Sequence, residues 1–208
     1  TFGITHPPGY PLFTIQGTLF VQALSFLRPA FAGGIYSITV AAAAVGVSFM
    51  IMRRRLDDLT SFGLALCWAF ATIFWAETNG VEIYTLNILL IVLTYLALES
   101  ESAYKWPLTI YLFGLCLCNH PSSLALAPAI IYRFFSEGEY RRVSRFPLYA
   151  GFLAAAGTMY LFLWVRSIHD PISDWGNPEG LNALWQHMSL KQYSGWVHNS
   201  WDNLWFAG

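Results

Sequence analysis

Charged side chains are scarce in this chain of 208 residues. Aspartate, glutamate, lysine and arginine make up only 11% of it, whereas hydrophobic residues make up 56%. Soluble domains usually carry about 25% charged residues. The formal net charge is −1, so the protein as a whole has no positive field that would attract a nucleic acid. The composition therefore predicts an integral membrane protein and argues against a nucleic-acid partner.

Cysteine is also sparse. The three cysteines, Cys67, Cys116 and Cys118, all lie in apolar runs. Together with His120, the last two resemble part of a metal site, but residues two apart on a helix point in different directions, and no fourth ligand is near. Buried apolar cysteines are the simpler interpretation, and they carry no information about the redox compartment. We identify no metal site, and a divalent metal is left open as a cofactor.

The common motifs for nucleotide binding and hydrolysis are missing as well. The chain contains no P-loop, no G-x-S-x-G, no H-E-x-x-H and no dinucleotide fingerprint. It begins at Thr1 without a signal-peptide pattern, and it ends at Gly208 without a closing element. We therefore expect the chain to be a piece of a longer protein.

Long apolar runs are what the chain has instead. A membrane-spanning helix needs about 20 apolar residues. Six runs are candidates, of which the short ones fit less well: Gly33–Met52, Ser61–Trp75, Tyr84–Leu98, Pro107–Cys118, Ser122–Phe135 and Pro147–Arg166. Brief loops separate them, so neighbouring helices should pack antiparallel. The sequence predicts an all-α, polytopic helical bundle over residues 33–166, and the resemblance described below implies that it is of the GT-C type. An external loop and interfacial helix should occupy 1–32, and an external polar loop with a short amphipathic helix should occupy 167–208.

The lysine and arginine positions predict the orientation of this bundle. Arg53–Arg55 follow the first run, Lys105 follows the third, and several arginines between 133 and 145 follow the fifth. Alternation places these loops on one side, which should be cytoplasmic. The segment Pro11–Leu27 then begins and ends on the external side, so it should lie in the membrane interface rather than cross the membrane.

The stretch GITHPPGYPLF, residues 3–13, leads into this interfacial segment. Each proline lacks an amide donor and fixes φ, and Gly9 permits backbone angles that other residues resist. These residues predict a stiff elbow that turns the chain from an external loop onto the membrane surface.

Polar residues gather on the predicted external side. Ionisable groups at membrane depth are costly and usually face a cavity or a pathway, so we predict an external, water-filled pocket roofed by loops. The candidate residues are His6, Tyr10, Glu77, Glu82, Tyr84, Asn119, His120, Arg166 and Trp175, with His187 and Tyr193 as weaker ones. All five histidines, including His198, fall on this side.

Most of these candidates also have an ordinary structural explanation. The Glu77 and Glu82 carboxylates can simply be solvated in a short loop, although Glu82 is the stronger candidate because an apolar run starts two residues later. Tyr10 and Tyr84 can be interface anchors. Arg166 can bind a lipid phosphate, or it can extend to the interface with no ligand.

The two histidines that precede prolines, His6 and His120, can cap a loop by hydrogen bonding to the backbone. His120 is favoured because the Asn119-His120-Pro121 break leaves backbone amides near Ser122 free to hold an anion such as a phosphate. Ser122 can alternatively be a plain helix cap.

Four segments resemble, in the same order, a family of multispanning membrane proteins: GITHPPGYPLF, ETNGVEIYTLN, GLCLCNHPSS and DWGNPEGLNALWQHMSLKQY. The family was formerly described as a domain of unknown function. It has many bacterial members, and its eukaryotic relatives include the endoplasmic-reticulum O-mannosyltransferase of plexin-type receptors. It is similar to the GT-C glycosyltransferases, which use polyprenyl-phosphate sugars as donors. The resemblance covers essentially all 208 residues.

The resemblance implies a glycosyltransferase that moves a hexose, such as mannose, from a lipid-linked polyprenyl-phosphate donor to a protein or glycan acceptor. The reaction would take place on the external or lumenal face of a bacterial inner membrane or of the endoplasmic reticulum. In the family an acidic motif of the Asp-x-Gly-Glu type precedes the elbow, so we expect the main catalytic base upstream of Thr1. The motif matches are His6, Pro7, Pro8, Gly9, Tyr10, Glu82, Tyr84, Asn87, Asn119, His120, Pro121, Trp175, Gly176 and Pro178.

Within this chain, Glu82 and His6 are the candidate catalytic residues. The candidate substrate-binding residues are Tyr10, Glu77, Tyr84, Asn119, His120, Arg166 and Trp175, with His120 and Arg166 near the phosphate. Two alternatives remain. Broken helices are typical of transporters, which favours a transporter or flippase of lipid-linked sugars, and the chain can also be a non-catalytic subunit of a membrane assembly.

Overall fold

Helices make up nearly all of the regular structure in a computed structural model that describes residues 2–194. The α-helices are α1 (Pro11–Ala23), α2 (Pro29–Met52), α3 (Asp58–Ala69), α4 (Thr72–Asn79), α5 (Ile83–Leu98), α6 (Lys105–Asn119), α7 (Ala127–Ser136), α8 (Phe146–Gly157), α9 (Leu161–Ser167) and α10 (Gly180–Met188). The 3-10 segments are η1 (Pro121–Leu126), η2 (Glu139–Arg141), η3 (Val143–Arg145), η4 (Thr158–Tyr160) and η5 (Lys191–Tyr193). The predicted all-α fold of a membrane protein is confirmed. His198 and the end of the predicted external loop lie outside the described residues.

Two helical segments are long and apolar enough to cross a membrane. They are α2, with 24 residues, and the run Val143–Ser167, with 25. At 1.5 Å per residue each is about 36 Å long, which exceeds the hydrocarbon core of about 30 Å. Counting α3 and α4 as one bent span gives a third. The helices α5, α6 and α7 have 16, 15 and 10 residues, so helix length alone does not support all six predicted crossings.

The second predicted span, Ser61–Trp75, is not a single helix. The helices α3 and α4 meet there at an angle of 60°, because Ala71 adopts an extended conformation (φ −61°, ψ 133°) that ends the helical hydrogen bonding. Helix α4 then continues as far as Asn79. Glu77 therefore lies on a helix and not in a loop, contrary to expectation.

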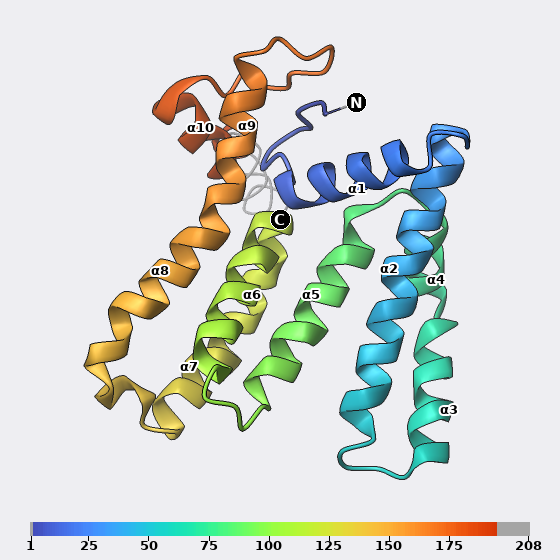
Figure 1. Cartoon of the computed structure of the whole chain (residues 1–208), viewed down its shortest axis with the longest axis vertical. Coiled ribbons are helices and arrows are strands. Elements are labelled where there is room, and N and C mark those ends of the chain that lie inside the picture. The colour runs from blue at the N-terminus through green and yellow to red at the C-terminus, as the bar shows by residue number, and fades with distance from the viewer. Residues whose placement is uncertain (1, 195–208) are drawn as a thin grey trace, which may run out of the picture.

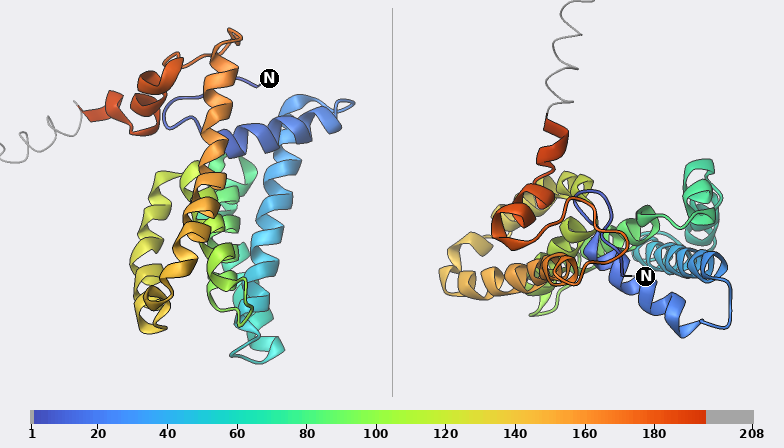
Figure 2. Two further views of the ribbon diagram at one scale, coloured as in Figure 1. Left: turned by 60° about the vertical axis from the view of Figure 1, so that its left-hand side comes forward. Right: turned by 90° about the horizontal axis from the view of Figure 1, so that it is seen from above.

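Helix α1 lies across the upper ends of α5 and α6 and reaches the start of α2, instead of running alongside these helices (Figures 1 and 2). It ends at Ala23, earlier than the predicted end at Leu27. Tyr36 of α2 holds it in place, because its hydroxyl donates to Gln16 Oε1 at 3.1 Å. The rings of Phe13 and Phe20 also pack on Tyr36, with centroids 5.8 and 5.5 Å away. An interfacial helix would lie in this orientation.

The helices α5 and α6 form the centre of the bundle, between α2 on one side and α8 on the other. Leu90 of α5, Val40 of α2 and Cys116 of α6 belong to the main buried apolar cluster. Cys116 and Cys118 are buried as expected, whereas Cys67 is exposed on α3 and that part of the expectation was wrong.

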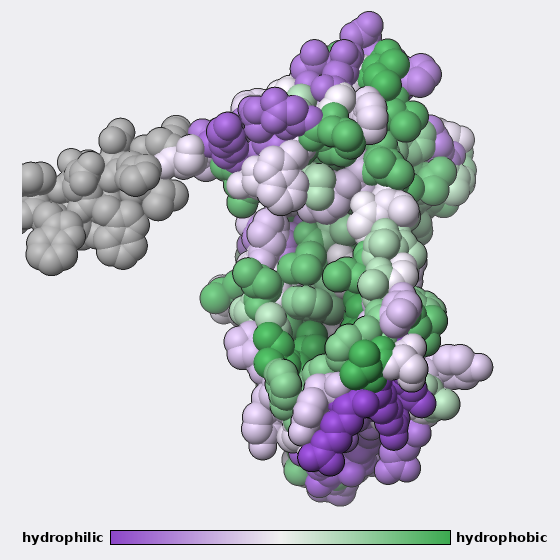
Figure 3. Space-filling view, turned by 90° about the vertical axis from the view of Figure 1, so that its left-hand side faces the viewer, coloured by the Kyte–Doolittle hydropathy of each residue, from purple (hydrophilic) through white to green (hydrophobic). Residues whose placement is uncertain are grey.

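Polar residues are concentrated at the two ends of the molecule, with an apolar band between them (Figure 3). At the end opposite to the elbow, ion pairs connect separate segments. Arg133 contacts Glu99 at 3.2 Å and Glu137 at 2.8 Å, and Lys105 contacts Glu137 at 2.6 Å. The basic loops that the sequence places on the cytoplasmic side thus share one end of the bundle. The compartment that each end faces stays a prediction.

Gly114 lets α6 and α8 approach closely, since a Cβ atom at this position would lie 2.7 Å from the Cβ of Ala156. We expect Gly114→Ala to lower the free energy of unfolding by about 1–3 kcal/mol through overpacking. Gly151→Ala, on α8 with open space around its Cβ, is the matched control and should be neutral or stabilising. Thermal unfolding of the full-length protein in detergent measures both. Equal midpoints for the two variants would contradict the close helix contact.

Candidate functional site

The predicted elbow stretch turns the chain into α1. The Gly9 amide donates to the His6 carbonyl at 2.9 Å, and the Thr5 hydroxyl donates to the Gly9 carbonyl at 3.0 Å. Gly9 (φ 87°) and Tyr10 (φ 42°) are both left-handed, a conformation that costs glycine little. Pro11 then begins the helix. The local hydrogen bonds and the fixed φ angle of proline together set the direction in which His6 and Tyr10 leave the backbone.

Five aromatic rings from four separate segments meet beside this turn. The ring centroids of His6 and Tyr10 are 5.3 Å apart, and those of His6 and Trp175 are 6.5 Å apart. Tyr10 stacks on His120 at 6.0 Å with an interplanar angle of 7°, and Tyr84 lies 5.5 Å from His120. We call these five residues the aromatic cluster. All of them were candidates from the sequence.

His120 occupies the break between α6 and η1. Its Nδ1 accepts a hydrogen bond from the Ser122 amide at 3.2 Å and lies 2.7 Å from the Ser122 hydroxyl. Nδ1 is therefore the acceptor nitrogen, and Nε2 carries the proton of the neutral ring. Burial lowers the pKa of His120. The expectation that the Ser122 amide is free to bind an anion was wrong, because the histidine side chain already caps it.

A buried polar network holds this break against the start of α5. Asn119 is fully buried, and its amide nitrogen donates to the Ile83 carbonyl at 3.1 Å and to Asn87 Oδ1 at 3.4 Å. The Ser123 hydroxyl donates to the same Asn87 oxygen at 2.8 Å. These bonds position His120 next to Tyr84. The substrate-binding role of Asn119 stays a prediction, since its described contacts are with the protein.

Glu82 lies at the edge of the aromatic cluster, at the start of α5. Its side chain is exposed and makes no ion pair with any described residue. Burial, and then the nearby Tyr84, Tyr193 and Glu82, raise the pKa of Tyr10. The Tyr193 hydroxyl also lies 3.4 Å from His6 Nδ1. A carboxylate, two imidazoles and three phenols are thus close together at this end of the molecule.

Two of the predicted site residues have no described contact with the cluster. Glu77 is half-buried on α4 and makes no side-chain hydrogen bond with any residue from 2 to 194. Arg166 donates from Nε to the Phe2 carbonyl at 2.6 Å, so this part of its guanidinium anchors the start of the chain to α9. Their substrate-binding roles stay predictions.

The loop after α9 is held against the N-terminal segment. The Ile4 amide donates to the Ser173 carbonyl at 2.7 Å, and the Ile4 carbonyl accepts from the Trp175 amide at 3.3 Å. The Ser167 hydroxyl lies 2.8 Å from a carboxylate oxygen of Asp174 and 2.8 Å from the amide oxygen of Asn177. These contacts explain how Trp175 comes to lie beside His6, although 169 residues separate them in the chain.

His187 was only a weak candidate from the sequence, yet it is buried, with 4% of its surface exposed. A Cβ atom at Gly9 would lie 3.0 Å from its Nε2, and one at Gly176 would lie 3.1 Å from its Nδ1. The ring thus separates the elbow from the loop after α9. The sequence signal for this buried ring was the pair of glycines in HPPG and DWGNP, Gly9 and Gly176. Both have positive φ and leave room for the imidazole.

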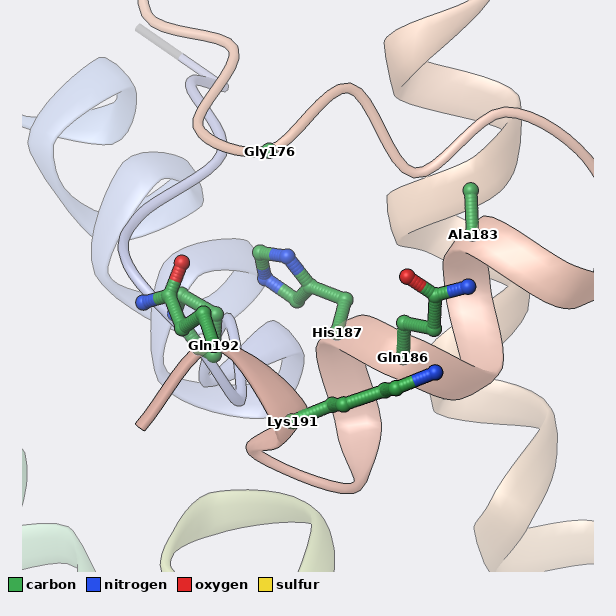
Figure 4. Close-up of a pocket in the computed structure, with 7 residues that line it drawn as sticks. Gly176, Ala183, Gln186, His187, Lys191 and Gln192 are labelled. Carbon is green, nitrogen blue, oxygen red and sulfur yellow. The ribbon is translucent and has the colours of Figure 1, made fainter. Parts of the chain in front are cut away.

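Two cavities flank the aromatic cluster. A groove of about 350 Å³ runs beside α1 and opens toward the start of α2. Its lining includes Phe13, Val21, Tyr36 and Val81, together with Thr5 and Thr14. A more polar pocket of about 300 Å³ lies between the elbow, the loop after α9 and α10 (Figure 4). In the described part of the chain, no group of three or more histidine, cysteine or carboxylate side chains could hold a metal ion.

The fold and the site define a helical membrane protein with a polar and aromatic centre at one end of its bundle. The chain belongs to the family described as the N-terminal domain of protein O-mannosyl-transferase TMEM260, whose sequence profile matches residues 1–144. It is 26% identical to mouse protein O-mannosyl-transferase TMEM260 across 92% of its length, and it spans 29% of that relative. No solved structure matches the chain. The predicted relationship to the O-mannosyltransferase family is confirmed.

The buried His187 predicts a loss of stability in acid. Burial is the main cause that lowers its pKa below the usual 6.5, and His6 adds to this effect while Asp174 and the Thr5 carbonyl oppose it. Below pH 6.5 the unfolded chain binds a proton that the folded chain does not, so the free energy of unfolding should fall as the pH falls through the folded pKa. His187→Gln should flatten this slope, whereas His169→Gln, at an exposed histidine, should leave it unchanged. The measurement is the unfolding midpoint of the unmodified protein and of both variants from pH 7.5 to 5. Parallel curves for all three proteins would rule out a contribution of His187 to the loss of stability in acid.

Proposed function

We propose that this chain forms part of a membrane glycosyltransferase of the GT-C type. The enzyme transfers a hexose, such as mannose, from a polyprenyl-phosphate donor to a hydroxyl group of a protein or glycan acceptor, on the external or lumenal face of the membrane. Mouse protein O-mannosyl-transferase TMEM260, the relative described above, carries this kind of activity in its name.

The observation that carries the proposal is the convergence of the elbow, the start of α5, the helix break at His120 and the loop after α9. Aromatic faces and hydrogen-bonding side chains are the groups that bind sugars, because a pyranose ring has apolar faces and polar edges. Here the exposed rings of Tyr84 and Trp175 supply the faces, and His6 and Glu82 supply polar atoms, while the buried Tyr10 supports the cluster by stacking on His120. The cluster lies at the end of a membrane bundle, where a substrate held in the bilayer can present its head group.

The groove beside α1 supports a lipid-linked donor. Its apolar side chains suit an isoprenoid chain, and Thr5 and Thr14 add hydroxyl groups to its lining. Because Thr5 and Phe13 line the groove, it runs next to the elbow that carries His6 and Tyr10. The phosphate of the donor would then lie between the groove and the aromatic cluster.

An inverting transfer needs one base and a stabilised leaving group. The acceptor oxygen attacks the anomeric carbon, its proton passes to a carboxylate, and the bond to the polyprenyl phosphate breaks. Glu82 is the candidate base among the described residues, and the family resemblance implies a further acidic motif upstream of the elbow. Hydrogen-bond donors placed at the phosphate stabilise the negative charge that develops on it as the bond breaks. His6 and the Nε2–H of His120 can supply them, since Nδ1 of His120 is already engaged.

The proposal is tested with the full-length protein, a polyprenyl-phosphate mannose and a set of acceptor domains. A base usually contributes about 100-fold or more to the rate, so Glu82→Gln should lower transfer by at least that factor. Glu101→Gln, at an exposed carboxylate on the opposite end, is the matched control. Absence of transfer by the unmodified protein would refute the function. Full transfer by Glu82→Gln would remove Glu82 as the base.

Trp175 gives a second test, because 54% of its surface is exposed beside His6. If its indole face packs against a sugar, Trp175→Ala should raise the KM of the donor or the acceptor roughly tenfold, equivalent to about 1.4 kcal/mol. Trp185→Ala is the control, since Trp185 is 65% exposed on α10. Steady-state kinetics with each substrate varied in turn measure the effect. Identical KM values in both variants would exclude a binding role for Trp175.

A further inference from the structure

The polar pocket behind the elbow has no role in the function proposed above. It has a volume of about 300 Å³, and Pro7 of the elbow forms part of its wall. The other lining residues are Gly176, Ala183, Gln186, His187, Lys191 and Gln192 (Figure 4). They come from the elbow, the loop after α9, α10 and η5. Pockets for small ligands begin at about 300 Å³, so this one suits a single compact molecule.

The side chains around the pocket retain hydrogen-bonding capacity. Gln192 Oε1 accepts from Trp175 Nε1 at 3.2 Å, which leaves its amide hydrogens available. Gln186 Nε2 donates to Asn182 Oδ1 at 3.3 Å, which leaves its oxygen available. Lys191 makes no ion pair with a described residue, and no carboxylate among residues 2–194 lines the pocket. One oxygen acceptor, one amide donor and one ammonium group therefore surround the same small volume.

The buried ring of His187 forms part of the pocket wall, and its Nε2 faces Gly9 of the elbow. Its Nε2 has no hydrogen-bond partner of ordinary geometry among residues 2–194. Figure 4 shows the imidazole standing between the Gly176 loop and Gln192. The two glycines with positive φ keep that position open for the ring.

Two contacts link the polar pocket to the aromatic cluster. Trp175 belongs to the cluster and bonds to Gln192 of the pocket. Tyr193, next to Gln192 in η5, approaches His6 of the cluster at 3.4 Å. A ligand in the pocket would thus lie directly behind the residues to which the proposed transfer is assigned.

We propose that this polar pocket is a second carbohydrate site, which binds one uncharged hexose unit. Neighbouring hydroxyl groups of a hexose act as donor and acceptor at once, and they match the Gln186 oxygen, the Gln192 amide and the Lys191 ammonium. Among residues 2–194 the lining contains one ammonium group and no carboxylate, so it gives no reason for a cationic ligand. The hexose can belong to the donor or to an acceptor that already carries sugar, and both offer the same chemistry to the pocket.

Binding to the full-length protein in detergent, without turnover, tests this site. Calorimetry and ligand-observed NMR with methyl α-mannopyranoside measure the affinity. Ala183→Leu should fill the pocket and weaken binding at least tenfold without removing a polar group. Ser189→Leu adds the same side chain just after α10, at an exposed position outside the lining, and should bind as the unmodified protein does. Gln192→Glu keeps an acceptor for Trp175 and should also weaken binding, through loss of the amide donor.

A polyprenyl-phosphate mannose distinguishes the two sources of the hexose. If Ala183→Leu weakens both ligands, the pocket holds the sugar of the donor. If it weakens only the free mannoside, the pocket holds a sugar of the acceptor. No saturable binding of the mannoside, or equal affinity in Ala183→Leu and Ser189→Leu, overturns the site. Because binding is measured apart from transfer, an inactive protein that still binds the mannoside would refute the proposed function and leave this site standing.

Discussion

The pairing of the first residues of the chain with the loop after α9 joins the two ends of the described chain at the elbow end of the molecule. Ile4 exchanges backbone hydrogen bonds with Ser173 and Trp175, and Arg166 holds the Phe2 carbonyl. Ile4 itself is fully buried, packed with Leu163 and Leu184. This contact holds the loop after α9, and with it Trp175, against the elbow.

The features that the sequence predicts well are those with local causes. Proline and glycine chemistry places a turn at residues 3–10, and apolar runs place the helices within a few residues of their actual limits. The break at His120 follows from Pro121. The bend between α3 and α4 has no such signal, because neither proline nor glycine occurs at Ala71 or beside it. Because this bend and the short helix after it were not predicted, Glu77 was expected in a loop, whereas it lies on α4.

The same difference between local and long-range causes applies to the candidate site residues. His6, Tyr10, Tyr84, His120 and Trp175 were chosen because their sidedness agreed, and the structure brings them together. The bond of Arg166 to Phe2 and the burial of His187 depend on segments more than 160 residues apart, and no periodicity or spacing encodes such contacts. The Ser122 amide was expected to be open because the sequence cannot show that the neighbouring imidazole turns back onto it.

The short helices at the centre of the bundle have a consequence for the lipid around them. At 1.5 Å per residue, α5 and α6 are about 24 and 22 Å long, against about 36 Å for α2. Their upper ends accordingly lie lower than the start of α2 (Figure 1). A bilayer that meets such short apolar walls becomes thinner locally. The water boundary would then dip toward His120, and a phosphate head group would reach that depth without leaving the lipid phase.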